Sequence, residues 1–171
     1  MGETSKQLVA EFLDAAVRDQ PRARALLADH PELLTAPTLG DETPLHFLVV
    51  EGYVDAVRLL VEAGAEIDVV GDSGHTPLLD AAILGNADVA EILLAYGANP
   101  NATSNTHDNV LHAAVASGNP QLVDLLLRAG ANPRYLTDLE ETVFDALPED
   151  PAKREELLQI LARHGVTQGA A

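Results

Sequence analysis

Four short sequence strings recur at a constant spacing of 33 residues and dominate the organisation of this chain. They are Thr43-Pro44-Leu45-His46, Thr76-Pro77-Leu78-Leu79, Asn109-Val110-Leu111-His112 and Thr142-Val143-Phe144-Asp145. Glycines follow the first three strings at fixed distances, at positions 52, 85 and 118 and again at 64, 97 and 130. A period of this length means that each unit packs against its two neighbours instead of around one shared centre. The sequence therefore predicts a single solenoid domain over residues 1–171.

Each unit carries the start and stop signals of two short helices. Thr43 and Thr76 are favourable N-caps, and the prolines after them suit the first helical position, where no amide hydrogen is missed. Asn109 caps equally well, so its replacement of threonine in the third unit is expected to cost nothing. Asn86 and Asn119 are expected to cap the second helices in the same way. Apolar residues at i, i+1, i+3 and i+4 of each second helix, such as Leu59 and Leu60, form a stripe that only flanking units can cover.

The period and the Thr-Pro-Leu-His string resemble the ankyrin repeat. The resemblance implies an all-α solenoid of stacked antiparallel helix pairs with projecting β-turn or hairpin loops. In this register the chain divides into an N-terminal capping repeat (4–36), three full repeats (37–69, 70–102 and 103–135) and a C-terminal capping repeat (136–168). The last unit fits only after a two-residue insertion around residues 148–151. We therefore expect an elongated loop between its two helices.

Composition narrows the classes of function. The chain has 27 acidic against 10 basic residues, a formal net charge of −17, so nucleic acid and anionic membranes would be repelled. It has no cysteine, which excludes disulfides, thiolate metal sites and cysteine nucleophiles. The N-terminal residues lack the basic and apolar regions of a signal peptide, and no apolar run reaches the roughly 20 residues that span a bilayer. We expect a cytoplasmic protein that binds neither nucleic acid nor membranes.

The negative charge itself has two interpretations. The first is solubility, because a net charge far from zero keeps solenoids apart. The second is recognition of a basic partner, or a decoy that imitates a polyanion. Solubility is favoured, because net charge by itself indicates how a protein associates with other molecules and does not indicate its fold or a particular partner.

The six histidines and many carboxylates form no recognisable catalytic or metal-binding motif. His75 and His107 lie near turn tips of successive units without a closely spaced second ligand, whereas zinc needs three or four converging ligands. The resemblance implies that His46 and His112 hydrogen-bond to neighbouring backbone. We therefore expect no catalytic residues, no metal ion and no cofactor, which argues against an enzyme.

The resemblance implies a protein-binding scaffold whose targets lie along the projecting turns and the first-helix face. Val50, Ile83 and Leu84 would form an apolar centre at positions that the scaffold does not require to be hydrophobic. Acidic residues would surround this centre, as in many binding hot spots. A competing interpretation is that Ile83 and Leu84 are partly buried against the next unit. The candidate partner-binding residues are Leu39, Glu42, Val50, Glu51, Asp72, His75, Asp80, Ile83, Leu84, Tyr96, Asn105, Asp108, Asp138 and Glu141.

Two features of the turns leave alternatives open. Asp80 stands where the other units carry phenylalanine or alanine, and it could cap its helix, pair with a neighbouring base or face the groove; the groove is favoured. The resemblance also favours glycine two positions before each string, where a tight turn requires a positive φ. Gly74 fits this pattern, but Asp41, His107 and Glu140 predict turns that are distorted or slightly strained.

The leading hypothesis is a monomeric, non-catalytic module that binds one or more proteins bearing an apolar anchor and a basic rim. The alternative is an acidic inhibitor or decoy of a basic, nucleic-acid-binding protein. Ionic strength separates the two, because decoy binding weakens steeply with salt whereas an apolar contact persists.

Overall fold

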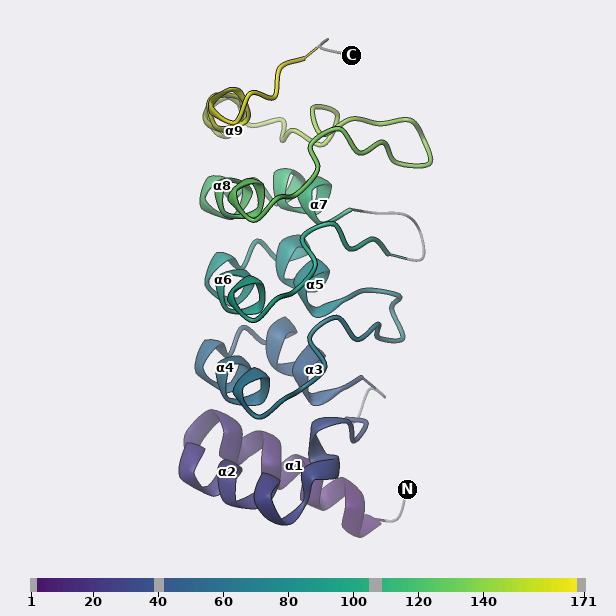
Figure 1. Ribbon diagram of the computed structural model, residues 1–171, viewed down its shortest axis with the longest axis vertical. Helices are drawn as coiled ribbons and strands as arrows, with labels where there is room; N and C mark the ends of the chain where they lie inside the picture. The colour runs from purple at the N-terminus through teal and green to yellow at the C-terminus, as the bar shows by residue number, and fades with distance from the viewer. Residues whose placement is uncertain (1–2, 39–41, 105–108, 169–171) are drawn as a thin grey trace.

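The computed structural model describes residues 3–38, 42–104 and 109–168, and its helices stack in pairs along one axis (Figure 1). In chain order they are α1 (Glu3–Arg18), α2 (Gln20–Asp29), the 3-10 helix η1 (Pro31–Leu34), α3 (Pro44–Val50), α4 (Val54–Glu62), α5 (Pro77–Ile83), α6 (Ala87–Ala95), α7 (Val110–Ser117), α8 (Pro120–Arg128) and α9 (Pro151–Arg163). The expected all-α solenoid is confirmed.

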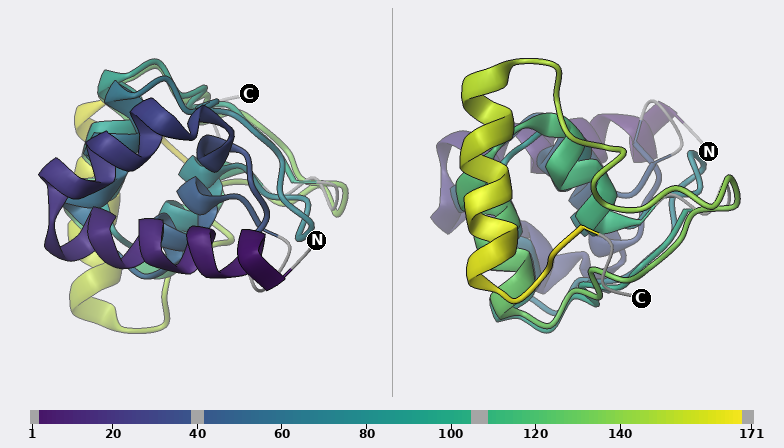
Figure 2. Two further views of the ribbon diagram at one scale, coloured as in Figure 1. Left: turned by 90° about the horizontal axis from the view of Figure 1, so that it is seen from below. Right: turned by 90° about the horizontal axis from the view of Figure 1, so that it is seen from above.

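The helices of the central repeats form two layers. The first helices make one layer, in which α5 packs against both α3 and α7. The second helices make the other layer, in which α6 packs against both α4 and α8. The connections between repeats project to one side, beyond the first helices, and overlie one another when the stack is viewed end-on (Figure 2). The first-helix layer and the projecting turns therefore border one continuous face.

The predicted capping residues start the first helices. The hydroxyl oxygens of Thr43 and Thr76 each accept a hydrogen bond from the amide three residues later, both at 3.3 Å. The side-chain oxygen of Asn109 accepts from the Leu111 amide at 2.9 Å. At the other end of α7, Gly118 has a φ of 71°, the left-handed conformation that stops the helix.

The core is a row of apolar side chains shared between neighbouring repeats. Leu60, Leu93 and Leu126 hold equivalent positions in α4, α6 and α8, and all three are fully buried. Burial of each such leucine contributes about 1.5–3 kcal/mol. Stacking of neighbours therefore supplies most of the stability, as the period predicts.

The histidine of the first repeat joins two repeats. The Nε2 of His46 lies 3.1 Å from the backbone carbonyl of His75, and its Nδ1 lies 2.9 Å from the Thr43 hydroxyl. A carbonyl only accepts, so His46 carries its proton on Nε2 and receives one from Thr43 on Nδ1. The expected structural role of His46 is confirmed.

The third repeat departs from the expectation that Asn109 costs nothing. His112 Nε2 donates to the Glu141 carbonyl at 3.3 Å, which parallels the first repeat. Among the described residues, however, His112 Nδ1 and Asn109 Nδ2 are buried without a hydrogen-bond partner. Asparagine preserves the cap but has no hydroxyl to donate to the imidazole. The predicted helix start is confirmed, and the two unpartnered nitrogens lead us to expect a cost that capping by itself does not predict.

The C-terminal unit also differs from the predicted helix pair, because residues 143–146 form turns instead of a first helix. The capping geometry is reversed: the Asp145 carboxylate accepts from both the amide and the hydroxyl of Thr142, each at 2.7 Å. Pro148 follows closely and disfavours helical conformation in the residue before it. Val143 and Leu147 remain buried and still cover the end of the core, while α9 packs on α8.

Candidate functional site

The apolar centre proposed from the sequence lies on the surface. Val50, Ile83 and Leu84 are 51%, 46% and 54% exposed, at the ends of α3 and α5. Ile83 and Leu84 are therefore partly buried, as the competing interpretation held, and about half of each residue still faces solvent. The three side chains are thus available to an apolar contact.

Phe47 extends the same face and was missed as a site residue. It lies one helical turn before Val50 on α3 and is 37% exposed. The signal was present in the sequence, because the equivalent position holds Asp80 in the second repeat and alanine in the third. A bulky ring that the repeat does not require was therefore visible before the structure.

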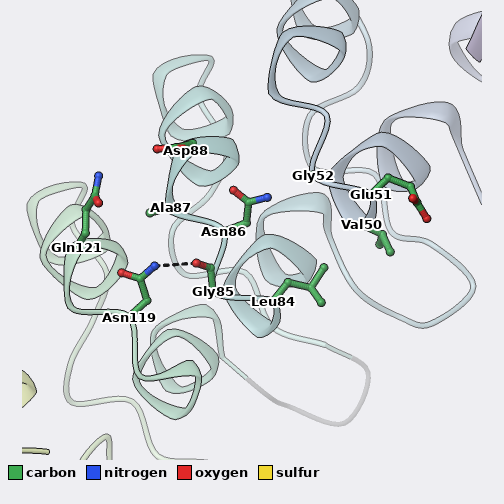
Figure 3. Close-up of a pocket in the computed structure, with 10 residues that line it drawn as sticks. All are labelled: Val50, Glu51, Gly52, Leu84, Gly85, Asn86, Ala87, Asp88, Asn119 and Gln121. Carbon is green, nitrogen blue, oxygen red and sulfur yellow. Dashed lines mark hydrogen bonds between the residues drawn. The ribbon is translucent and has the colours of Figure 1, made fainter. Parts of the chain in front are cut away.

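A pocket of about 490 Å³ opens where the first helices turn into the second helices (Figure 3). Val50 and Leu84 supply its apolar lining, and the exposed carboxylates of Glu51 and Asp88 supply negative charge. Asp88 was not a candidate from the sequence, because the first turn of a helix is an ordinary place for an acid. The pocket can accommodate a long side chain with an aliphatic stem and a positive end.

Asparagines after the helix-stopping glycines hold the floor of this pocket. Asn119 donates from its side-chain nitrogen to the Gly85 carbonyl of the preceding repeat at 2.7 Å, the bond drawn in Figure 3. Its side-chain oxygen accepts from the Leu122 amide at 3.2 Å and so caps α8. Asn86 caps α6 through the same bond to Val89, also at 3.2 Å. The caps were predicted, but the bond between repeats was not.

On the turn side of the face, His75 and Asp80 form a pair. His75 Nδ1 lies 2.9 Å from Asp80 Oδ1, and the two side chains are 23% and 13% exposed. Of the three roles considered for Asp80, pairing with a neighbouring base is the one observed, and the groove-facing role stays a prediction. The pair fixes the base of the turn against α5.

Glu42 belongs to the structure of the neighbouring turn. Its carboxylate accepts from the Ser73 amide at 3.5 Å and lies so close to Gly71 that a Cβ at position 71 would overlap it. One of its oxygens also lies 3.7 Å from His46 Nδ1. Only about a quarter of the side chain is exposed, so Glu42 contributes less open surface than its position in the repeat suggests.

The remaining candidates fall into three groups. Glu51, Asp72, Asp138 and Glu141 are exposed, as expected for an acidic rim. Leu39, Asn105 and Asp108 lie outside the described residues, as do Asp41 and His107, whose turns were expected to be distorted. Glu140 has a φ of 59° and is the single non-glycine residue with a positive φ in the described part of the chain. Its turn keeps the same two backbone hydrogen bonds as the Gly74 turn, so the expected distortion is not observed and the strain falls on the Glu140 backbone.

Tyr96 does not join the other candidates. It caps the C-terminal end of α6, in the second-helix layer, and its hydroxyl donates to Glu62 of α4 at 3.5 Å. Arg24 of α2 donates to the same carboxylate at 2.8 Å and lowers the pKa of Glu62 below its ordinary value. Tyr96 is exposed, as expected, but it lies in the other layer from Val50, Ile83 and Leu84, and its partner-binding role stays a prediction.

The described residues contain no group of three or more histidine, cysteine, aspartate or glutamate side chains positioned to hold a metal ion. Within the same residues, no helix combines the length and apolar character that crossing a bilayer requires. The surface chemistry that the structure offers is an apolar centre with carboxylates around it.

Comparison with known proteins points to the repeats. Residues 12–104 and 68–137 match the family described as ankyrin repeats (3 copies). A stretch of 34 residues is 53% identical to a putative palmitoyltransferase, ZDHHC13, from Danio rerio, and covers 20% of this chain and 5% of that protein. A stretch of 69 residues is 41% identical to a probable E3 ubiquitin-protein ligase, XBOS33, from Oryza sativa subsp. japonica, and covers 39% of this chain and 13% of that protein.

Both similarities are thus confined to a small part of a much longer relative. The family match, by contrast, runs from residue 12 to residue 137 and takes in most of the chain. Together with the stacked helix pairs, it establishes that this protein belongs to the ankyrin repeat family, whose repeats generally serve protein–protein interaction.

Proposed function

We propose that this protein is a non-catalytic module that binds a partner protein on its first-helix face. The observation that carries the proposal is the exposure of Val50, Ile83 and Leu84, each about half exposed at the C-terminal ends of α3 and α5 in adjacent repeats. Val50 and Leu84 line the same pocket. Water-exposed aliphatic side chains clustered on one face favour association with an apolar surface. In this proposal the binding face is formed by the three full repeats, residues 37–69, 70–102 and 103–135.

The partner suited to this face presents an apolar anchor flanked by lysine or arginine. Glu51 and Asp88 border the pocket at the helix ends, and Asp72 is exposed on a neighbouring turn. A lysine or arginine can lay its aliphatic stem on Leu84 and bring its charge to these carboxylates. Burial of the apolar part supplies affinity, and the charges supply orientation and association rate.

A rigid binding surface explains how a small number of apolar side chains can be enough to bind a partner. The bond from Asn119 to Gly85 and the bond from His46 to the His75 carbonyl each connect neighbouring repeats. A surface held by such bonds is ordered before binding, so little conformational entropy is lost on association. The absence of cysteine suits a reducing compartment, and the proposed setting is the cytoplasm.

The alternative, an acidic decoy of a basic nucleic-acid-binding protein, rests on the net charge of −17. A decoy would bind through charge spread over a large area, and its affinity would fall steeply as salt rises. Binding through the apolar centre would survive the same change. The exposed aliphatic side chains favour the first mechanism.

The test is affinity capture from the native host with wild type and Ile83→Asp/Leu84→Asp, at low and high salt. A matched control is Ala95→Asp/Tyr96→Asp. Ile83 and Leu84 are the last residue and C-cap of α5, whereas Ala95 and Tyr96 are the last residue and C-cap of α6, in the other layer. Both double variants therefore add two negative charges at equivalent helix ends.

We expect the α5 double variant to lose partners that wild type and the α6 double variant retain at high salt. Loss of a buried apolar hot spot weakens binding by about tenfold or more. Recovery of the same proteins by all three would rule out the apolar anchor. Loss of the partners from wild type at high salt would favour the decoy.

A further inference from the structure

A second cavity lies at the N-terminal end of the first-helix face, between α1, the residues after η1, and α3. Its volume is about 280 Å³. Val9 and Leu13 of α1, Pro37, and Phe47 of α3 form apolar walls, and Lys6 contributes a charged group. The N-terminal end of α1 points toward the side on which the turns project (Figures 1 and 2). The cavity therefore borders the face proposed to bind a partner.

The cavity is large enough for one bulky apolar side chain. An apolar cavity of about 150 Å³ binds benzene, and this one has nearly twice that volume. The Phe47 ring, 37% exposed, lines it from the first-helix layer, one turn from Val50 on the same helix. A segment lying across Val50 and Ile83 can thus continue into the cavity.

The charge in this cavity is opposite in sign to the rest of the face. Other basic residues near the N-terminus are already paired: Arg18 with Asp14 at 3.0 Å, and Arg22 with Glu11 at 2.6 Å. Lys6, in contrast, makes no hydrogen bond or ion pair with any of the described residues. An unpaired ammonium group beside an apolar cavity, in a chain of net charge −17, is complementary to a carboxylate on an apolar ligand.

We propose that this cavity receives an anchor of the partner protein that consists of a bulky aliphatic or aromatic side chain next to aspartate or glutamate, with the carboxylate on Lys6. The inference rests on the proposed function, since it assigns an occupant to one end of the same face. It also gives the partner a direction. The acidic anchor lies at α1, and the basic residues lie over the carboxylates of the following repeats.

The test uses small probes so that it does not depend on finding the partner. ¹⁵N-labelled protein is titrated with acetyl-Leu-Asp-amide and followed by the shifts of backbone amide resonances. Acetyl-Leu-Asn-amide removes the charge at constant shape, acetyl-Ser-Asp-amide removes the apolar group, and decanoate offers the same chemistry from a lipid source.

We expect the Leu-Asp probe to shift the amides of Val9, Ala10 and Phe47. The Leu-Asn probe should bind about two- to fivefold more weakly, as for a solvent-exposed ion pair. The Ser-Asp probe should bind at least about tenfold more weakly, because it buries no apolar side chain. Equal binding of the Leu-Asp and Leu-Asn probes, shifts confined to other repeats, or no binding at millimolar concentration would overturn the proposal. Tighter binding of decanoate would assign the cavity to a lipid and overturn it equally.

Two variants separate this site from the proposed function. Ala10 is exposed and lines the cavity, so Ala10→Leu should fill it and abolish probe binding without disturbing the core. Lys6→Gln should make the Leu-Asp and Leu-Asn probes equivalent. Ile83→Asp/Leu84→Asp, which tests the proposed function, should leave probe binding unchanged. Probe binding that resists Ala10→Leu would place the probe elsewhere and contradict the inference, whatever the outcome of partner capture.

Discussion

The first and third repeats contain the same histidine at the same position, yet the two imidazoles are bonded differently. His46 uses both ring nitrogens, one toward the Thr43 hydroxyl and one toward a carbonyl of the next repeat. His112 keeps the bond to the next repeat and leaves its other nitrogen buried without a partner among the described residues. One substitution, asparagine for threonine three residues earlier, accounts for the difference.

The comparison teaches that a capping residue in a repeat has two separable roles. Threonine and asparagine both cap the helix, but only threonine has a hydroxyl that accepts from the backbone and donates to the imidazole at once. The neighbours differ as well: the first repeat stacks against a full helix pair, whereas the third stacks against turns and the single helix α9. The imidazole of the third repeat therefore has one hydrogen bond fewer than that of the first.

The largest expected effect comes from replacing each histidine by leucine, the residue that the second repeat has at this position, Leu79. His46→Leu leaves the Thr43 hydroxyl and the His75 carbonyl without their partner and should lower the free energy of unfolding by about 2 kcal/mol. His112→Leu loses one bond but also removes an unsatisfied nitrogen, so it should cost less than about 1 kcal/mol. Urea unfolding with an unchanged m-value measures both. An equal loss of unfolding free energy in the two variants would show that the two imidazoles contribute alike, and it would contradict the proposed difference between the repeats.

Exchanging the capping residues should make the hydrogen bonding of the first and third repeats more alike, and the stability of the protein should change accordingly. Asn109→Thr supplies the missing hydroxyl and removes a buried, unpaired amide nitrogen, so it should stabilise the protein by about 1 kcal/mol. The reverse exchange, Thr43→Asn, should destabilise by a similar amount. Thr76→Asn is the control. The second repeat has Leu79 where the first has His46, so the Thr76 hydroxyl has no imidazole to which it could donate. Destabilisation by Thr76→Asn as large as that by Thr43→Asn would assign the effect to capping alone.

The connection between α8 and α9 should give the C-terminal half a distinct dependence on pH. Asp124 on α8 accepts from His164 Nε2 at 2.8 Å, and this bond, together with the charge of Arg128, lowers the pKa of Asp124. A carboxyl whose pKa is depressed by folding stabilises the protein above its unfolded value and loses that contribution as pH falls through the folded value.

The pH effect is measured by comparing wild type with Asp124→Asn. At neutral pH the variant should be less stable by about 0.5–1 kcal/mol. The difference should begin to shrink below about pH 4, the ordinary value of an aspartate, and should vanish below the lowered pKa of the folded carboxyl. The equivalent residue in α4 is Arg58, which carries no carboxyl group, so the first repeat has no counterpart to this effect. A difference that persists unchanged at low pH would exclude the ionic contribution.

The smallest expected effect concerns the turn at the start of the C-terminal unit. Glu140 has a φ of 59° where the second repeat has Gly74 with a φ of 80°. Glu140→Gly should relieve the strain of a side chain in the left-handed region and stabilise by a few tenths of a kcal/mol to about 1 kcal/mol. Gly74→Ala should act in the opposite direction by a similar or larger amount. A loss of stability in Glu140→Gly would mean that the side chain itself holds the turn.

Much of the repeat was predictable because its determinants are local. Thr43 and Asn86 cap their helices through bonds that reach only three residues, so sequence spacing was sufficient to identify them. The exposed carboxylates and the apolar positions of the second helices follow from periodicity in the same way. The identity of the partner-binding residues remains a prediction.

The bonds that cross between repeats were harder to predict. The pairing of Asp80 with His75, the bond from Asn119 to Gly85 and the unsatisfied nitrogen of His112 each depend on where a neighbouring turn places its polar groups. The loss of the first helix in the C-terminal unit is an intermediate case. Pro148 was visible in the sequence, but the reversed bond from Thr142 to Asp145 was not.

The amino-acid sequence by itself determined that this protein is a row of stacked helix pairs. A 33-residue period leaves each apolar stripe without cover except from an adjacent copy, and no globular arrangement satisfies that requirement. Only the tertiary structure decided which side chains the copies leave uncovered, namely Phe47, Val50, Ile83 and Leu84, and how the Lys6 cavity is enclosed. Exposure is a property of the packed neighbours, whereas capping and period are properties of the chain alone.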